Sequence, residues 1–107
     1  MANDNLLLYL KALSDPIRLD IVNILSCGEL CACEILEGLS IQQTTLSHHM
    51  KTLTTSGLIS KRKEATFSFY KINEEAFSLL HNLMGDLISG GDNCICEPGK
   101  SNTTKCR

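Results

Sequence analysis

Two helical patterns separated by a very short polar turn lie near the middle of this chain, at residues 32–39 and 43–55. The turn is Ser40-Ile41-Gln42, and Gly57 has the position of a C-terminal cap after the second pattern. Apolar side chains of the second pattern share one narrow sector at about 100° per residue: Leu46, Met50 and Leu53. Polar side chains gather on the opposite side: Thr44, His48, Lys51, Thr52 and Thr55. A short helix, a tight turn and a longer helix with a free polar face are the parts of a helix-turn-helix.

The flanking segments complete a small, mainly α fold. A helix is predicted over residues 5–13, and Asp15-Pro16 then starts a second helix, which ends before Gly28. Its apolar residues lie nearly all round, so we expect it at the centre of the core. Alternating side chains predict a β hairpin in which Leu58 to Lys63 pairs with the strand containing Phe67 and Phe69, across Glu64-Ala65. A last helix covers 74–89. The fold class is therefore α+β, mainly α with a small β hairpin: a winged helix-turn-helix.

The last helix has two apolar stripes where one small core needs only one. We assign the excess to a homodimer interface formed with the first helix. The side chains expected there are Leu6, Leu10, Phe77, Leu80, Met84 and Leu87. Residues 1–90 are expected to form the DNA-binding and dimerisation domain, and residues 91–107 a flexible tail containing three of the cysteines.

Charge is distributed unevenly along the chain. The 107 residues have a formal net charge of −2, so no overall positive excess favours nucleic acid. Between residues 42 and 72, however, one acidic residue stands against five basic ones: Lys51, Lys61, Arg62, Lys63 and Lys71. A basic hairpin beside a polar helix suits DNA, with phosphates contacted by the hairpin and bases by the helix. The alternative is a merely solvated charged hairpin. No catalytic motif is visible, and we expect no enzyme.

Six cysteines in 107 residues are too few for a disulfide-built secreted scaffold. The longest uninterrupted apolar run, Leu6 to Leu10, is too short for a membrane span, and no basic region precedes it. We therefore expect a cytoplasmic protein with reduced thiols and no membrane association. In that compartment, clustered cysteines favour metal binding or redox chemistry.

Several motifs in the same order resemble the ArsR/SmtB winged-helix metalloregulators. They are Ala12-Leu13-Ser14-Asp15-Pro16-Ile17-Arg18, Glu29-Leu30-Cys31-Ala32-Cys33-Glu34-Ile35, Gln43-Thr44-Thr45-Leu46-Ser47-His48-His49-Met50 and Ser56-Gly57-Leu58-Ile59. The resemblance covers about residues 5–88. It implies a homodimeric repressor that binds a palindromic operator and releases it when a toxic metal or metalloid binds.

The resemblance also implies which residues contact DNA. Base-reading side chains lie early in the recognition helix: Gln43, Thr44, Thr45, Ser47 and His48. Phosphate contacts are expected from Lys51, Lys61, Arg62 and Lys63. His49 falls nearer the apolar side and is interpreted as a packed histidine. Gln42 stands where the family often has a serine N-cap, and the hairpin tip lacks the frequent glycine.

The Glu-Leu-Cys-x-Cys string is similar to the family's thiolate sensors of arsenite, antimonite, cadmium or lead, which makes Cys31 and Cys33 the first candidate ligands. Trivalent arsenic prefers three sulfurs, but the position of the third cysteine in enteric arsenic sensors is Leu36 here. A third sulfur is expected from the tail, first from Cys94 or Cys96 and then from Cys106, since Cys27 is more simply interpreted as a buried apolar residue. The alternative is that the three tail cysteines form a second site of their own.

The spacing of the two helix cysteines constrains the geometry. Residues two apart on a regular helix point about 200° apart, so Cys31 should lie at or just before the helix start. The helix N-terminus should lower the pKa of its thiol there, and metalloid binding should open the first turn.

Three alternatives stay open at this level. In the first, a repressor with this fold responds to cadmium or lead instead of arsenite or antimonite. In the second, two thiols are oxidised to a disulfide or sulfur bridge instead of binding a metalloid. In a different class, the chain is a thiol-rich metal scavenger that ignores DNA. A zinc or nickel site on the last helix is rejected because His81 is alone there.

Overall fold

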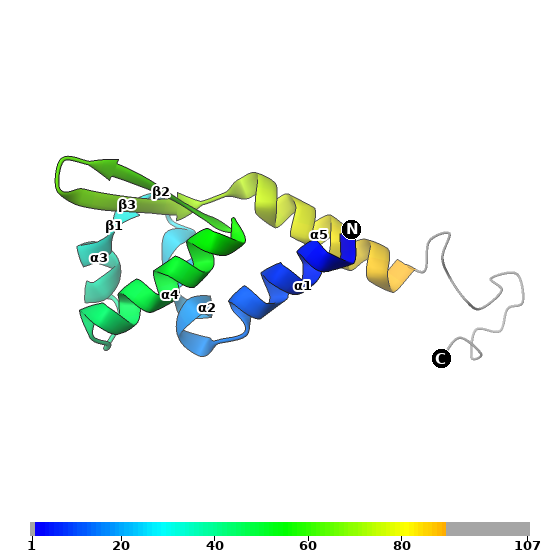
Figure 1. Ribbon diagram of the computed structural model, residues 1–107, viewed down its shortest axis with the longest axis horizontal. Helices are drawn as coiled ribbons and strands as arrows, with labels where there is room; N and C mark the ends of the chain where they lie inside the picture. Colours follow the sequence, from blue (N-terminus) through cyan, green and yellow to red (C-terminus); the bar gives the residue numbers. More distant parts are fainter. Residues whose placement is uncertain (1, 90–107) are drawn as a thin grey trace, which may run out of the picture.

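The computed structural model describes residues 2–89, in which five helices surround a core and a three-stranded antiparallel sheet projects from one end (Figure 1). The elements are α1 (Ala2–Leu13), α2 (Pro16–Leu25), β1 (Leu30–Cys31), α3 (Ala32–Glu37), α4 (Gln43–Ser56), β2 (Ile59–Glu64), β3 (Phe67–Ile72) and α5 (Glu74–Ser89). α3 and α4 form the helix-turn-helix, and the β2–β3 hairpin forms the wing. The predicted winged helix-turn-helix is therefore confirmed.

Local signals set the helix ends as the sequence predicts. Asp15 caps α2, and its carboxylate accepts hydrogen bonds from the backbone N–H groups of Ile17 (2.9 Å) and Arg18 (3.2 Å). Pro16 occupies the first turn. Gly57 ends α4 with φ of +91°, a left-handed conformation that glycine adopts without steric cost. α3 is two residues shorter than predicted and ends at Glu37.

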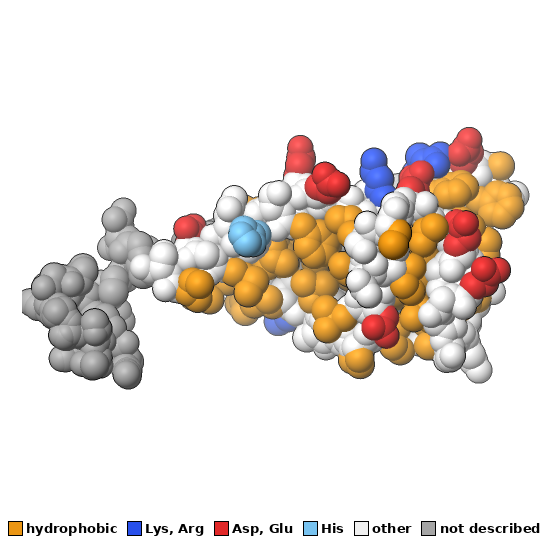
Figure 2. All heavy atoms as spheres, turned by 180° about the vertical axis from the view of Figure 1, so that it is seen from behind, with side chains coloured by type: hydrophobic (Ala, Val, Ile, Leu, Met, Phe, Trp, Pro, Cys, Tyr) orange, Lys and Arg blue, Asp and Glu red, His pale blue; other side chains and the backbone are white. Residues whose placement is uncertain are grey.

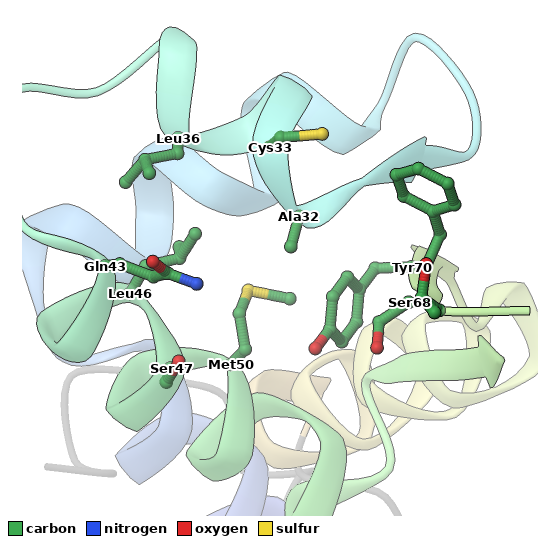
Figure 3. Close-up of a pocket in the computed structure, with 11 residues that line it drawn as sticks. Ala32, Cys33, Leu36, Gln43, Leu46, Ser47, Met50, Ser68 and Tyr70 are labelled. Carbon is green, nitrogen blue, oxygen red and sulfur yellow. The ribbon is translucent and has the colours of Figure 1, made fainter.

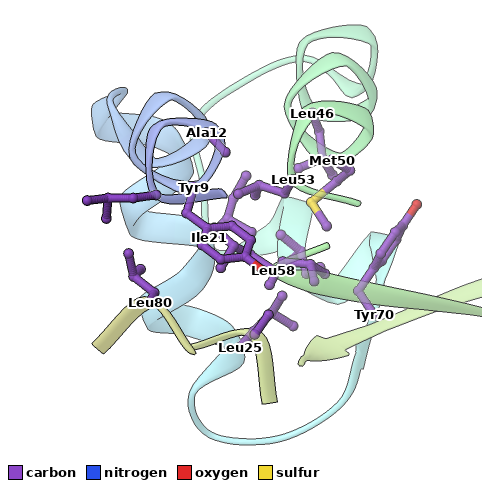
Figure 4. Packing of buried hydrophobic residues seen from close by; sticks show 14 residues of the cluster. Tyr9, Ala12, Ile21, Leu25, Leu46, Met50, Leu53, Leu58, Tyr70 and Leu80 are labelled. Carbon is purple, nitrogen blue, oxygen red and sulfur yellow. The ribbon is translucent and has the colours of Figure 1, made fainter. Parts of the chain in front are cut away.

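The core lies between the helices and the base of the wing (Figure 4). The most completely buried large side chains are Ile21, Leu25, Ile35, Leu53, Leu58 and Ile59. The predicted inner face of α4 is confirmed, since Leu46, Met50 and Leu53 are all buried. α2 is less central than expected: only Ile21 and Leu25 are buried, and Leu19 is 53% exposed.

The sheet differs from the prediction in two ways. β1 was not predicted, and it adds a third strand by pairing antiparallel with β3, Leu30 opposite Tyr70 and Cys31 opposite Phe69. The hairpin loop lies one residue later than expected, at 65–66, because Glu64 pairs with Phe67. With no glycine or asparagine to mark the loop, Ala65 adopts a φ of +58°.

Two of the residues expected at a dimer interface, Leu6 and Leu80, are instead buried in the core of their own subunit, where α1 and α5 pack together. Other apolar side chains of these helices are exposed: Leu7, Leu8, Leu10, Leu79, Met84, Leu87 and Ile88. Figure 2 shows hydrophobic side chains gathered along this half of the molecule. Within the described chain, no helix combines the length and apolarity needed to cross a bilayer. The predicted tail, with its cysteines, lies outside the described residues.

Candidate metalloid sensor and DNA interface

The exposed face of α4 carries most of the predicted base-reading residues. Gln43, Thr44, Ser47 and His48 are exposed and Thr45 is half-buried, as is typical of the first turns of a helix whose other side faces the core. Lys51 continues this exposed face one turn further. The structure thus places the predicted set together on one accessible surface, as the helical period requires.

His49 joins α4 to the start of α2. The side chain is buried, and its Nδ1 accepts a hydrogen bond from the Arg18 guanidinium at 3.0 Å, which specifies the tautomer protonated on Nε2. Its Nε2 lies 3.8 Å from the Asp15 carboxylate. Arg18 also donates to the Ala12 carbonyl at 2.6 Å. The interpretation of His49 as a packed histidine is confirmed, and its contacts fix the recognition helix against α1 and α2.

A cavity of about 340 Å³ lies where α3, α4 and the wing meet (Figure 3). Its lining combines residues of α3, α4, the hairpin loop and β3: Ala32, Cys33, Leu36, Gln43, Leu46, Ser47, Met50, Thr66, Phe67, Ser68 and Tyr70. Burial raises the pKa of Tyr70 and keeps its hydroxyl neutral. One face of the wing is therefore turned toward the base-reading side of α4.

The basic residues of the wing divide between the two faces of the sheet. Lys61 is opposite Tyr70 and Lys63 is opposite Ser68, so both lysines share the face that borders the recognition helix. Within residues 2–89, neither lysine lies within ion-pair distance of a carboxylate. Both lysines are exposed and remain candidates for phosphate contact.

Arg62 points to the other face, opposite Phe69, and its guanidinium lies 4.7 Å from the centre of that ring. All three of its nitrogens are engaged: Nε and Nη2 donate to the Glu29 carboxylate at 3.2 and 3.0 Å, and Nη1 donates to Glu64. These carboxylates raise the pKa of Arg62, so it keeps its charge. The predicted phosphate contact from Arg62 would require breaking these ion pairs.

The two candidate ligand thiols, those of Cys31 and Cys33, lie side by side at the junction of β1 and α3. Cys31 is the N-cap of α3, with extended backbone angles of φ −85° and ψ 164°, as expected from the spacing. Its Sγ is 2.9 Å from the Sγ of Cys33. The Glu34 carboxylate accepts a hydrogen bond from the Cys31 backbone N–H at 2.9 Å and closes the first turn. Because the thiols already meet, the first turn need not open to bring them together.

The expected lowering of the Cys31 pKa is wrong. Its pKa is raised, first by the hydrogen bond with the Cys33 thiol and also by burial, and the backbone N–H of Glu34 opposes the rise without overcoming it. A neighbouring sulfur and partial burial therefore outweigh the helix N-terminus. Cys33 is the exposed member of the pair.

Among the described residues, two cysteine sulfurs, those of Cys31 and Cys33, lie together at the candidate site. No group of three or more histidine, cysteine or acidic side chains that could hold a metal ion occurs within residues 2–89. Cys27 is exposed at the end of α2, so its interpretation as a buried apolar residue is wrong, although it does not complete such a group. The other candidates, Cys94, Cys96 and Cys106, lie outside the described residues.

Comparison with known proteins places this arrangement in a family. Residues 15–61 match the family model described as bacterial regulatory protein, arsR family. The chain is 41% identical over 101 residues to the arsenical resistance operon repressor of Staphylococcus xylosus, covering 94% of this chain and 97% of that protein. This chain belongs to the arsR family. The family is a helix-turn-helix family of regulatory proteins, in agreement with the predicted absence of an enzymatic role.

Solved structures of other proteins agree with the ArsR-family fold. The ArsR-like transcriptional regulator from Rhodococcus sp. RHA1 superposes with a TM-score of 0.75 at 19% identity, covering 84% of this chain and 85% of that one. The homodimeric winged helix-turn-helix DNA-binding domain Mb0332 from Mycobacterium bovis superposes with a TM-score of 0.65 at 27% identity, covering 83% and 86%. The first likeness shows the fold, and the second shows it in a homodimer.

Sequence reasoning missed Glu29 as a functional candidate in this ArsR-family chain. Its carboxylate binds Arg62, 33 positions later, and that same hydrogen bond lowers the pKa of Glu29. The only sequence signal that could have placed Glu29 near the wing is the strand Leu30–Cys31 that follows it, and two residues are too few to show a strand period.

Proposed function

We propose that this chain is a metalloid-responsive transcriptional repressor that binds a palindromic operator as a homodimer and dissociates from it when trivalent arsenic or antimony binds its cysteine thiolates. The observation that supports this most strongly is the position of Cys31 and Cys33. Their sulfurs are 2.9 Å apart, at the first residue of the helix-turn-helix and at the end of a strand of the wing sheet. A soft ion held there borders β3 of the wing, which pairs with β1, and the cavity that Cys33 shares with α4.

For the DNA contact, we assign base reading to the exposed first turns of α4 and phosphate contact chiefly to the lysines. Lys61 and Lys63 share the wing face that borders α4, and Lys51 lies on α4 itself. In a symmetric dimer, the two recognition helices would then meet half-sites about one helical turn of DNA apart. A repressor works where the chromosome is, so we assign it to the cytoplasm.

For the inducer, soft thiolates favour soft ions, and a pyramidal trivalent arsenic centre takes three sulfurs. Because residues 2–89 supply two adjacent thiols, we assign the third to the tail. α5 runs away from the wing (Figure 1), and its 16 residues span about 24 Å. Cys94 and Cys96, five and seven residues after Ser89, reach at most about 18 and 25 Å, whereas Cys106 reaches about 60 Å. The thiols lie further still, because Cys31 is opposite Phe69 and β3 continues for about 10 Å, to Ile72, before α5 begins. Within one subunit, Cys106 is therefore the best placed third ligand, and Cys94 or Cys96 would have to come from the second subunit.

The test is operator binding by the full chain, measured by fluorescence anisotropy with DNA from upstream of its own gene. Arsenite, antimonite, cadmium, lead and peroxide are added separately. We expect arsenite and antimonite to release the DNA from the parent protein. Cys31→Ser and Cys33→Ser should still bind operator but no longer release it, and Cys106→Ser should respond more weakly.

Cys27→Ser is the matched control, because Cys27 is an exposed thiol outside the sulfur pair. It should behave like the parent. Release by cadmium or lead alone would favour the other inducer class, and release by peroxide alone would favour a thiol redox sensor. A chain that binds arsenite but no DNA would be a scavenger.

A further inference from the structure

The thiol pair and Arg62 lie on the same face of the wing sheet. In the antiparallel register, Cys31 on β1 is opposite Phe69 on β3, and Phe69 is opposite Arg62 on β2. Side chains directly opposite one another in a sheet point to the same face and are close enough to interact. Cys31, Phe69 and Arg62 therefore form one row across all three strands, on the face away from Lys61 and Lys63.

Glu29 closes this row from the sensor side. It precedes Cys31 by two residues, and its carboxylate binds the Arg62 guanidinium through two hydrogen bonds of 3.0 and 3.2 Å. The guanidinium in turn lies over Phe69. The segment that holds the sensor thiol is thus joined to the outer strand of the wing by an ion pair as well as through β3.

We infer that Glu29 and Arg62 form a tether that transmits metalloid capture from Cys31 to the wing, and that Arg62 serves this positioning role instead of binding phosphate. The inference rests on the proposed function. Two thiolates bound at about 2.3 Å to one pyramidal centre, with about 100° between the two bonds, are about 3.5 Å apart, which is wider than the present 2.9 Å. Sharing an ion therefore moves the sulfurs apart at the end of β1. The Glu29 carboxylate, in the same short segment, is displaced against Arg62, and the wing shifts relative to α4.

The size of the effect is limited by the exposure of the pair. The side chains of Arg62 and Glu29 are 50% and 33% exposed. Ion pairs this accessible to water change an equilibrium by about 1.4- to 5-fold. We therefore expect loss of the tether to reduce arsenite-induced weakening of DNA binding by a factor of about three, leaving the remainder to the contacts of β1 and α3.

The experiment compares neighbouring residues of the full-length protein. For each variant, the operator dissociation constant is measured with and without arsenite, and protection of cysteines from alkylation reports arsenite capture. Glu29→Gln and Arg62→Gln should capture arsenite as the parent does, but the ratio of the two dissociation constants should fall about threefold. Glu64→Gln is the matched control for Glu29→Gln, because Glu64 binds the same guanidinium from within the hairpin and has no connection to the sensor. Its ratio should stay at the parent value.

Lys63→Gln is the matched control for Arg62→Gln. We expect Lys63→Gln to weaken operator binding and flatten its salt dependence while leaving the ratio of the two dissociation constants unchanged. Arg62→Gln should leave operator binding and its salt dependence unchanged while lowering that ratio. In the double variant Glu29→Gln/Arg62→Gln, the ratio should fall no further than in either single variant.

Several results would overturn the tether. They are an unchanged ratio in Glu29→Gln, an equal loss in Glu64→Gln, or failure of Glu29→Gln to capture arsenite, which would place Glu29 at the thiol site itself. If the parent protein does not release DNA with arsenite, the proposed function fails first and the tether with it. If the parent does release DNA and Glu29→Gln releases it equally, only the tether fails.

Discussion

Dimerisation through α1 and α5 can be tested with two leucines that are equally exposed. Leu7 on α1 and Leu19 on α2 are both 53% exposed in the subunit. Only Leu7 lies on one of the two helices, α1 and α5, whose exposed apolar side chains we assign to the dimer interface. If α1 forms part of the interface, Leu7→Ala should weaken the dimer and Leu19→Ala should not. The matched exposure removes general differences in hydrophobicity from the comparison.

The magnitude follows from the area that a dimer would cover. Leu→Ala removes three carbon atoms, whose complete burial contributes about 2.4 kcal/mol of free energy at about 0.8 kcal/mol each. Because 53% of the Leu7 surface is still exposed in the subunit, a dimer interface that covers it gains about 1.3 kcal/mol of this. An interface with twofold symmetry contains each residue twice, so the total is about 2.5 kcal/mol, on the order of a 60-fold rise in the dimer dissociation constant. Sedimentation equilibrium over a range of concentrations measures it. A change below about threefold for Leu7→Ala, or an equal loss for Leu19→Ala, would refute the assignment of the interface to α1.

Two further predictions concern the helix cap and the DNA-binding surface. Burial raises the pKa of Asp15, but hydrogen bonds from the Arg18 and Ile17 backbone N–H groups and the nearby charge of Arg18 outweigh it and lower the pKa overall. The stability that this carboxylate contributes is therefore present above its unfolded pKa of about 3.9 and is lost as the pH falls through its lower folded pKa. Thermal unfolding between pH 2 and 6 should show that Asp15→Asn, which keeps a capping oxygen, loses less stability on acidification than the parent. Lys61→Ala should weaken binding to all DNA sequences alike and reduce the salt slope by about one, whereas His48→Ala should change the preference among sequences, as competition binding at several salt concentrations would reveal.

Strong local signals made most of the fold predictable. Asp15-Pro16 and Gly57 define helix ends through backbone chemistry that hardly depends on the rest of the chain. The inner face of α4 follows from the helical period alone. β1 could not be predicted, because a two-residue strand has no period and exists only where β3 provides a pairing edge.

The sequence was enough to predict which residues make up the candidate site, but not which side chains they contact. Spacing placed Cys31 before the helix start, but the raised pKa of its thiol depends on the Cys33 side chain, whose direction the sequence does not specify. Similarly, counting charges treated Arg62 like its lysine neighbours. Its engagement by Glu29 depends on a tertiary approach over 33 positions, which no local pattern indicates. The alternation of side chains along the predicted strand already implies that Arg62 faces away from Lys61 and Lys63.

Leu36 offers a direct test of the idea that the helix site lacks one sulfur. Cys33 and Leu36 line the same cavity one helical turn apart, although their side chains point away from each other (Figure 3). Leu36→Cys would therefore add a third thiol that meets the pair once its side chain turns toward Cys33. In a chain whose tail cysteines are all replaced by serine, we expect weak release of operator by arsenite, and Leu36→Cys should restore it.

Leu36→Ala in the same background is the control for lost packing, since Leu36 is a half-buried residue that contacts the core. It should leave the response weak. If Leu36→Cys binds arsenite through three thiols, as counted by alkylation, but still keeps its DNA, then completing the ligand set is not what releases the operator. In that case a tail cysteine must act because it binds the ion from a segment attached to α5, and not merely because it completes the ligand set.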